Sequence, residues 1–143
     1  MRKNRLIIQK SVLVIGLFLA VFCFNALSSD VSPEQTVCKF YNALKNKDYD
    51  QAYECISKTM KDGKDKEKWA KDWKEMVDFA KVEILDFSVS ECKIDGDKAT
   101  VRVSVKAKDM FNKDGITEQE TDYLVMEDSI WKIDITEVDL PDL

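Results

Sequence analysis

The sequence predicts an α+β fold in which about three N-terminal helices pack on a curved antiparallel sheet of about four strands. Apolar residues recur with a helical period between residues 33 and 80, and with a period of two between residues 82 and 135. Turn residues divide the second region into four segments, as expected for consecutive hairpins. Helices followed by strands, without alternation, are typical of an α+β domain.

The first helix is predicted to begin at Ser32-Pro33-Glu34-Gln35, where Ser32 can cap, Pro33 suits the first helical position and Gln35 completes a capping box. Its apolar stripe consists of Val37, Phe40, Tyr41 and Leu44. Asn46-Lys47-Asp48 ends this helix and caps a second one, whose apolar face consists of Tyr49, Ala52, Tyr53 and Ile56. So short a turn requires two antiparallel or sharply crossed helices.

A polar linker over residues 61–65 leads to a third predicted helix, from about Lys66 to Ala80. Its apolar stripe consists of Trp69, Trp73, Met76 and Val77. Two tryptophans on one stripe fit either a core or the wall of a ligand pocket, and the core is the more common role.

The strand pattern begins beyond Lys81. The first predicted strand contains Val82, Ile84, Phe87 and Val89 and ends near Cys92, and Asp95-Gly96 is suited to a type I′ hairpin turn. The second strand alternates cleanly from Ala99 to Ala107. A third is predicted from Thr117 to Glu127, and in the fourth Trp131, Ile133 and Ile135 alternate. Residues 139–143 are expected to be a frayed tail.

Residues 1–28 have the pattern of a secretory signal. Four basic residues precede an apolar run from Val12 to Phe24, which is short for a membrane-spanning helix. Small residues at Ala26 and Ser28 favour cleavage after Ser28; the alternative is an uncleaved signal anchor. Lipidation at Cys23 is disfavoured by the preceding Phe22. Either form places residues 29–143, one domain, outside the cytoplasm, whether secreted, periplasmic or at the cell surface.

Composition excludes several classes of function. The chain has 22 Lys and Arg against 27 Asp and Glu, and loss of the leader would leave 18 basic residues. This acidic balance argues against nucleic-acid binding, and contact with a membrane is expected only through the N-terminal segment. Histidine is absent, which removes the usual proton shuttle, the His-activated nucleophiles and most zinc sites. We therefore expect no metal and no cofactor.

Three cysteines remain beyond the leader: Cys38, Cys55 and Cys92. In an antiparallel helical hairpin that turns near Lys47, Cys38 and Cys55 come level and lie beside the apolar stripes. This geometry predicts a Cys38–Cys55 disulfide with Cys92 free. The alternatives are a Cys55–Cys92 pair and three buried, inert thiols.

Two segments resemble the nuclear transport factor 2-like superfamily, whose fold is that of the cystatin-like cone. Residues 40–53 carry Phe40-Tyr41-x-Ala43-Leu44 and Asp48-Tyr49-x-x-Ala52-Tyr53, similar to the opening helical pair, and Trp131-Lys132-Ile133 is similar to the closing strand. The likeness is strongest to small exported bacterial members of uncharacterised role. It implies a sheet wrapped round the helices, a conical pocket and, in many members, dimerisation through the outer sheet face.

The resemblance implies three functions. The preferred one is a noncatalytic extracytoplasmic module that binds a small ligand or a partner envelope protein, through the cone or the sheet face. The others are a pocket enzyme of ketosteroid-isomerase type and a structural dimerisation domain. The candidate pocket residues are Tyr41, Tyr53, Trp69, Trp73 and Tyr123. Tyr41, Tyr53, Tyr123, Asp122 and Asp134 supply atoms for acid–base chemistry, but no spacing selects a base among them.

Overall fold

The computed structural model describes residues 31–139, so the predicted leader and most of the predicted tail lie outside the described residues. Four helices precede four strands. The helices are α1 (Pro33–Lys45), α2 (Tyr49–Glu54), α3 (Lys58–Lys61) and α4 (Lys66–Ala80), and the strands are β1 (Glu83–Asp95), β2 (Lys98–Lys108), β3 (Ile116–Glu127) and β4 (Ile130–Val138). The sheet is antiparallel in the order β1-β2-β3-β4, which confirms the predicted α+β architecture. No helix within residues 31–139 is long and apolar enough to cross a membrane.

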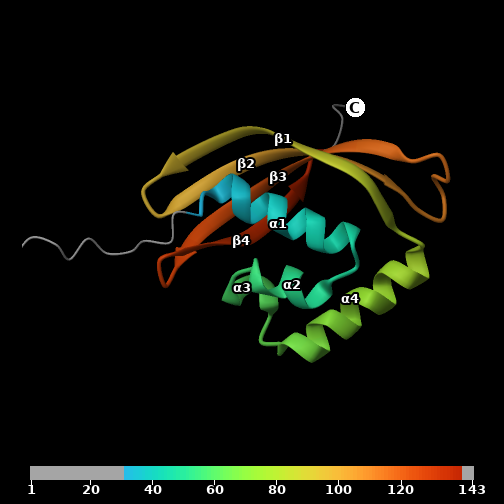
Figure 1. The fold of residues 1–143 in the computed structure, drawn as a ribbon, viewed down its shortest axis with the longest axis horizontal. Helices are drawn as coiled ribbons and strands as arrows, with labels where there is room; N and C mark the ends of the chain where they lie inside the picture. Colours follow the sequence, from blue (N-terminus) through green and yellow to red (C-terminus); the bar gives the residue numbers. More distant parts are fainter. Residues whose placement is uncertain (1–30, 140–143) are drawn as a thin grey trace, which may run out of the picture.

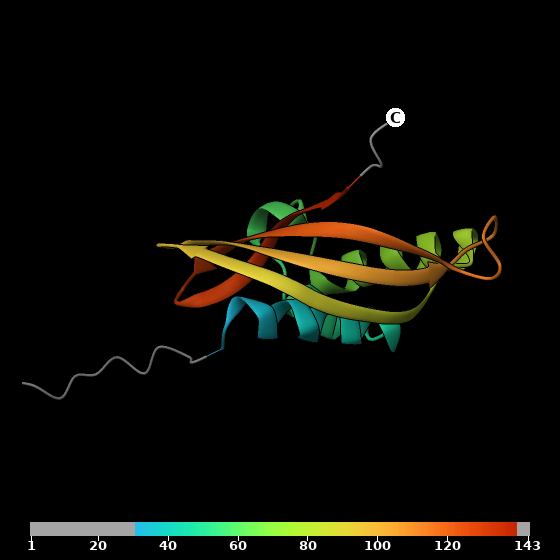
Figure 2. The same cartoon turned by 90° about the horizontal axis from the view of Figure 1, so that it is seen from above.

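The sheet arches over the helices and the core lies between the two layers (Figure 1). Seen from above, the long strands cross the molecule as one twisted layer, with α1 running along β1 (Figure 2). Side chains from the inner face of β2, such as Val101 and Val103, are fully buried. Polar side chains alternate with them and face outward, so β2 follows the predicted pattern.

Helix α1 begins as predicted. The Ser32 hydroxyl accepts a hydrogen bond from the Gln35 amide, and the Gln35 side chain accepts one from the Ser32 amide, which completes the capping box. The helix buries Val37, Phe40 and Tyr41 against the sheet. The Thr36 hydroxyl donates to the carbonyl of Trp131 at 3.4 Å, so α1 is fastened to β4 as well as to β1.

Helix α2 is shorter than predicted, because the chain after Glu54 pairs with the sheet instead. The Ile133 amide donates to the Cys55 carbonyl at 2.9 Å, and the Ser57 amide donates to the Ile133 carbonyl at 2.8 Å. Ile56 thereby forms an isolated parallel bridge with Ile133 and is fully buried. A short helix that was not predicted, α3, comes just before the predicted polar linker and is capped by the Ser57 hydroxyl.

The predicted Cys38–Cys55 disulfide is not present: Cys38, Cys55 and Cys92 are all free. The prediction assumed that Cys55 lies on a second helix antiparallel to the first. Cys55 instead caps α2 and belongs to the segment held against β4, and its thiol donates to the Gln51 carbonyl at 3.4 Å. Its pairing partner is therefore the backbone of β4 rather than the side chain of Cys38.

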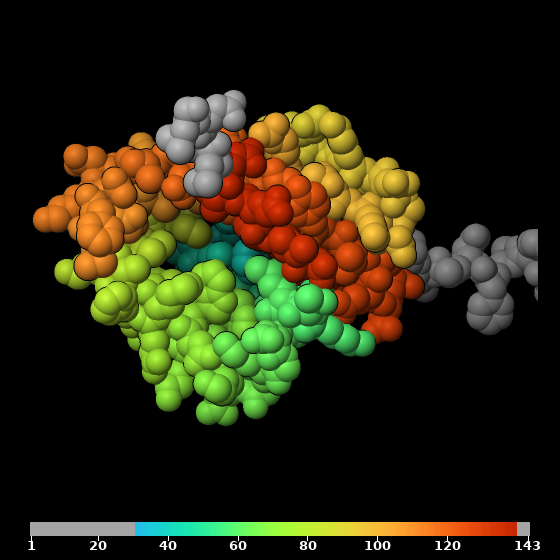
Figure 3. All heavy atoms as spheres, turned by 180° about the vertical axis from the view of Figure 1, so that it is seen from behind, coloured from blue at the N-terminus to red at the C-terminus, as the bar shows by residue number. Residues whose placement is uncertain are grey.

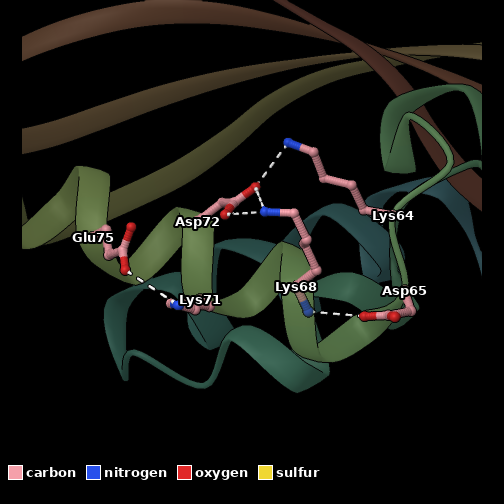
Figure 4. Close-up of polar contacts among 6 residues, drawn as sticks. All are labelled: Lys64, Asp65, Lys68, Lys71, Asp72 and Glu75. Carbon is pink, nitrogen blue, oxygen red and sulfur yellow. Dashed lines mark hydrogen bonds and ion pairs between the residues drawn. The ribbon is translucent and has the colours of Figure 1, made fainter.

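Helix α4 keeps Trp69 and Val77 buried, whereas Met76 is 50% exposed although it belongs to the predicted stripe. Its outer face carries lysines paired with acids one turn away. Asp72 lies between Lys64 and Lys68, at 3.0 Å from each ammonium, whereas Lys71 and Glu75 are 3.9 Å apart (Figure 4). The Lys64–Asp72 pair links the segment that precedes α4 to the helix itself.

The hairpin turns differ in type from the prediction. Of the two residues that join β1 to β2, only Gly96 has a positive φ (60°), which fits a type II′ turn rather than type I′. Between β3 and β4 both turn residues have positive φ, 50° at Asp128 and 65° at Ser129. The β3–β4 hairpin, and not the β1–β2 hairpin, therefore has the type I′ turn.

Candidate functional site

Four side chains form a polar cluster between α1 and the inner face of the sheet. The Tyr41 hydroxyl donates to Oε2 of Glu120 at 2.5 Å, and the Thr136 hydroxyl donates to Oδ1 of Asp122 at 2.5 Å. Asp122 is fully buried, and its second oxygen, Oδ2, has no hydrogen-bond partner among the described residues. A buried carboxylate oxygen without a donor is costly and uncommon in a folded protein.

The inner face of β3 positions both acids. Leu124 and Asp122 are buried and alternate with outward residues, and Glu120, two residues earlier, is partly exposed. In the ladder Glu120 pairs with Val103 and Asp122 with Val101, whose side chains belong to the core. Two acids thus occupy positions that an amphipathic strand normally gives to apolar side chains.

A one-residue bulge in β4 brings Thr136 to Asp122. Leu124 pairs with Ile133 but Tyr123 pairs with Ile135, so Asp134 is an extra residue in β4. After the bulge, each side chain points to the opposite face from the one that a regular strand would give it. Thr136 therefore points inward to Asp122, and Ile135 points outward and is 49% exposed. The predicted inward position of Ile135 is therefore wrong.

Burial determines the acid–base character of the cluster. It raises the pKa of Asp122 to about 6, with a further increase from the charge of Glu120, whereas the bond from Thr136 and the nearby hydroxyl of Tyr41 act in the opposite direction. Burial also raises the pKa of Glu120, and burial together with both carboxylates raises the pKa of the Tyr41 hydroxyl. No lysine or arginine forms an ion pair with Glu120 or Asp122 within residues 31–139.

The back of the molecule is hollowed next to these elements. Figure 3 shows a recess bordered by α4, by β4 and by the end of the sheet where β2 leads into β3, with α1 at its floor. The cluster joins α1, which forms the floor of the recess, to β3 and to β4, which borders it (Figure 3). The sequence resemblance implied a conical pocket, and this recess is the candidate for it (Figure 3).

The predicted pocket residues separate into three places. Tyr41 belongs to the acid cluster. Tyr53, Trp69 and Trp73 form an aromatic ladder, with ring centroids 5.8 Å apart for the first pair and 5.3 Å for the second. The Tyr53 hydroxyl donates to the Lys64 carbonyl, and the Lys61 ammonium lies over the Tyr53 ring. The ladder therefore packs α2 against α4 and the chain that enters it.

Tyr123 lies on the outer face of the sheet, between the buried Asp122 and Leu124, and its hydroxyl donates to Glu137 at 3.2 Å. Asp134, the bulge residue, accepts a 2.6 Å hydrogen bond from the buried Ser57 hydroxyl. Of the residues that could supply acid–base chemistry, the structure brings Tyr41 and Asp122 to one cluster and places Tyr53, Tyr123 and Asp134 elsewhere.

Glu120 was not predicted. Its signal is in the sequence: in the segment from Thr117 to Glu127, Glu120 and Asp122 share the alternation phase of Leu124. Acids in the inward phase of a half-buried strand indicate a polar site inside the fold. Their relation to Tyr41, 79 residues away from Glu120, required the tertiary structure.

A second concavity lies on the outer face of the sheet. It is a shallow groove of about 300 Å³ lined by Glu91, Lys93, Thr100, Arg102, Thr121 and Asp139. Arg102 pairs with Asp139 at 2.6 Å and Lys93 with Glu91 at 3.3 Å. Because its charges compensate one another, this groove has no unsatisfied group directed at a ligand.

The described residues form no metal-binding cluster, and two of their three thiols have raised pKa values. Residues 31–139 contain no group of three Cys, Asp or Glu side chains arranged to hold a metal. Burial raises the pKa of the Cys55 thiol, and burial together with Glu34 raises the pKa of Cys92 to about 11. A thiol with a raised pKa is a poor nucleophile at neutral pH.

No protein-family model matches the sequence, and no curated protein is similar to it. Solved structures do match. A SEC-C motif containing protein from Rhodopseudomonas palustris superposes with a TM-score of 0.60 at 20% identity, over 75% of this chain and 78% of that one. An NTF-2 like protein of unknown function from Shewanella oneidensis has a TM-score of 0.56 at 18% identity, over 73% and 93% of the chains.

A ketosteroid isomerase-like protein from Erwinia carotovora atroseptica has a TM-score of 0.54 at 15% identity, over 82% of this chain and all of that one. The TM-scores of these three matches establish a shared fold, whereas sequence identities this low carry no activity across. The fold predicted from the resemblance is thereby confirmed, and the function has to be argued from this chain's own residues.

Proposed function

We propose that this chain, which has the nuclear transport factor 2-like fold, is a noncatalytic binding module that holds a small ligand in its cone. The observation that carries the proposal is the fully buried Asp122, whose Oδ2 has no hydrogen-bond partner among the described residues, in a cluster that joins α1, the floor of the recess, to β3 and β4. A bound ligand that donates a hydrogen bond to this oxygen would remove the cost of leaving it unpaired.

Apolar walls next to the polar cluster support the same function. The Tyr41 ring lies 5.5 Å from the Phe87 ring and 5.4 Å from the Phe40 ring, centroid to centroid. Ligand pockets typically combine such aromatic walls with a few polar groups that fix the ligand's orientation. The outer sheet face exposes Ser88, Arg102 and Gln119 together with Tyr123 and Ile135, and the charges of its groove are paired with one another, so it supports a ligand site less well.

Titration with Nile red, a neutral apolar dye, tests whether the cone accepts a ligand. We expect a saturable rise in fluorescence with one dye per chain, and amide NMR shifts that cluster at Tyr41, Phe87, Glu120 and Thr136. Shifts confined to the outer-face groove, at Lys93 and Arg102, would move the site to the other side of the sheet. Absence of saturable binding would contradict the proposal.

We also infer that the domain works outside the cytoplasm. The support is the pattern of residues 1–28, a basic segment followed by an apolar run, which lies outside the described residues. Mass spectrometry of the protein recovered from the producing cells should find Ser29 at the N-terminus. An intact N-terminus in the membrane fraction would indicate an anchor, and an intact chain in the cytoplasm would contradict export.

One observation favours a second function, a pocket enzyme that moves a proton in the manner of ketosteroid isomerases. Tyr41 and Glu120 pair phenol to carboxylate at 2.5 Å, beside a carboxyl whose pKa is raised to about 6. A β,γ-unsaturated 3-ketosteroid would test it, because isomerisation produces a conjugated enone that absorbs in the ultraviolet. We would expect the Glu120→Gln and Asp122→Asn variants to lose about 10²-fold or more in rate. Absence of turnover by the wild type would leave the binding function alone.

A further inference from the structure

We propose that the ligand of the cone is an organic cation: a small primary ammonium with an apolar body. This inference rests on the proposed binding function and specifies its ligand class. It starts from a charge imbalance, because two carboxyl groups lie next to each other inside the fold and neither forms an ion pair with a lysine or arginine of residues 31–139.

The hydrogen-bond inventory of the cluster matches an ammonium group. Thr136 already donates to Oδ1 of Asp122, and the single Tyr41 proton is directed to Oε2 of Glu120, although the Tyr41 hydroxyl also lies close enough to Asp122 to affect its pKa. The atoms that remain are acceptors: Oδ2 of Asp122, Oε1 of Glu120 and the lone pairs of the Tyr41 hydroxyl. A primary ammonium has three N–H donors and no acceptor, so it complements this set. While both carboxyl groups are ionised, a neutral acceptor such as a ketone would find no free donor there; only a protonated Asp122 would supply one.

Electrostatics favours a cation over a neutral donor. An ionised carboxylate taken out of water needs a counter-charge, and a bound ammonium provides one where the protein does not. Charge-assisted hydrogen bonds are also about twice as strong as neutral ones. The acidic balance of the chain, a formal net charge of −5, adds a long-range attraction for cations.

The surroundings suit an apolar body on the same ligand. The half-buried Phe87 packs its ring beside Tyr41, and the fully buried Val101 and Val103 flank the two acids on the adjacent strand. An aromatic or alkyl group attached to the ammonium would lie against Phe87 while the ammonium reaches the carboxylates. Inorganic cations lack this body, and the described residues contain no cluster suited to a metal ion.

Isothermal titration with 2-phenylethylammonium, compared with neutral 2-phenylethanol at the same ionic strength, tests the inference. We expect one saturable site for the amine and at least tenfold weaker binding of the alcohol. Asp122→Asn and Glu120→Gln keep the shape of the side chain and remove a charge, and each should weaken amine binding tenfold or more. Glu137→Gln, which removes an exposed acid from the outer face, should leave the affinity within twofold.

The outcomes separate this inference from the proposed function. Equal binding of amine and alcohol, or amine binding that Asp122→Asn and Glu120→Gln leave unchanged, would overturn the cationic ligand while leaving a small-ligand cone. Nile red binding without amine binding would have the same meaning. If Nile red, the amine and the alcohol all fail to bind, both the cationic ligand and the proposed binding function are overturned. Circular dichroism establishes whether each variant is folded, and either of the two cluster variants suffices.

Discussion

The Thr136 hydroxyl reaches Asp122 across the β3–β4 ladder, 2.5 Å from Oδ1, only because β4 contains one extra residue. A regular strand would have directed Ile135 at that carboxylate. Because of the bulge at Asp134, the fully buried Asp122 faces the hydroxyl of Thr136 instead of an aliphatic side chain. The polar cluster therefore depends on backbone irregularity as much as on residue identity.

Replacement of Tyr41 by Phe should weaken the fold. The variant removes the donor to Glu120 and leaves a partly buried carboxylate without its hydrogen bond. We expect a loss of about 1–2 kcal/mol in the free energy of unfolding, measured by urea denaturation. Tyr123→Phe is the matched control, because its hydroxyl serves an exposed outer-face contact and its removal should change nothing measurable. Equal losses of unfolding free energy in Tyr41→Phe and Tyr123→Phe would mean that the inner hydrogen bond stabilises the fold no more than the exposed one on the outer sheet face.

Asp122 should make the protein less stable as the pH rises from 4 to 7. Its pKa is about 6 in the folded state against 3.8 for the ordinary side chain, so between these values the folded state binds more protons than the unfolded state. The free energy of unfolding then falls with increasing pH, by about 3 kcal/mol for this one group. Asp122→Asn removes the titration while keeping the shape.

Urea denaturation of the wild type and Asp122→Asn at pH 4.5, 5.5, 6.5 and 7.5 measures this effect as a difference. The stability of the wild type relative to the variant should decline across the series and level off above pH 7. The other acids titrate in both proteins, and their contributions largely cancel in that difference. A constant difference across the four pH values would mean that Asp122 is not the titrating group.

Ser57→Ala should destabilise the contact between the helical segment and β4. The Ser57 side chain is fully buried, donates to Asp134 at 2.6 Å and accepts from the Met60 amide at 3.0 Å as the cap of α3. Loss of both bonds should lower the free energy of unfolding by about 1–2 kcal/mol. Ser104→Ala, at an outer-face serine that accepts from Gln119, should cost no more than about 0.5 kcal/mol. If Ser57→Ala leaves the free energy of unfolding unchanged, other contacts hold the bulge in place.

Asp72→Asn should lower the melting temperature in a salt-dependent way. Its carboxylate contacts two ammonium groups at 3.0 Å, from Lys64 and Lys68 (Figure 4). Both contacts are partly exposed, so the decrease should be small at low ionic strength and vanish in 1 M NaCl. Glu75→Gln, which loses one contact of 3.9 Å, should have the smaller effect. A decrease that persists in 1 M NaCl would indicate a packing role for Asp72.

The cysteines should react as free thiols with different rates. Cys55 is 3% exposed and burial raises its pKa, so iodoacetamide should label it far more slowly than Cys38, which is only half-buried. Peptide-level mass spectrometry of the labelled native protein measures each site. In 6 M urea all three thiols should be labelled at similar rates. Protection of Cys38 in urea without reductant would reveal a disulfide that the structure does not contain.

Much of the fold was predictable because its signals are local. The Ser32 cap, the stripe of α1 and the alternation of β2 each depend on a few neighbouring residues, and each forms as predicted. The errors arose where distant segments compete for one backbone. Cys55 and Ile56 have helical spacing, yet hydrogen bonds to β4 remove them from α2, and no periodicity within the helix could have indicated this.

The sequence by itself determined the order of helices and strands, the capping of α1 and the presence of acids in the inward phase of β3, because these depend on period and residue type. The tertiary structure decided which groups meet. Tyr41 and Glu120 are 79 residues apart, and Thr136 faces Asp122 through a bulge of one residue in β4. Strand register alternates with a period of two, so a single added residue exchanges the inner and outer faces. That shift in register is set by contacts across the whole domain, and no local pattern in the chain records it.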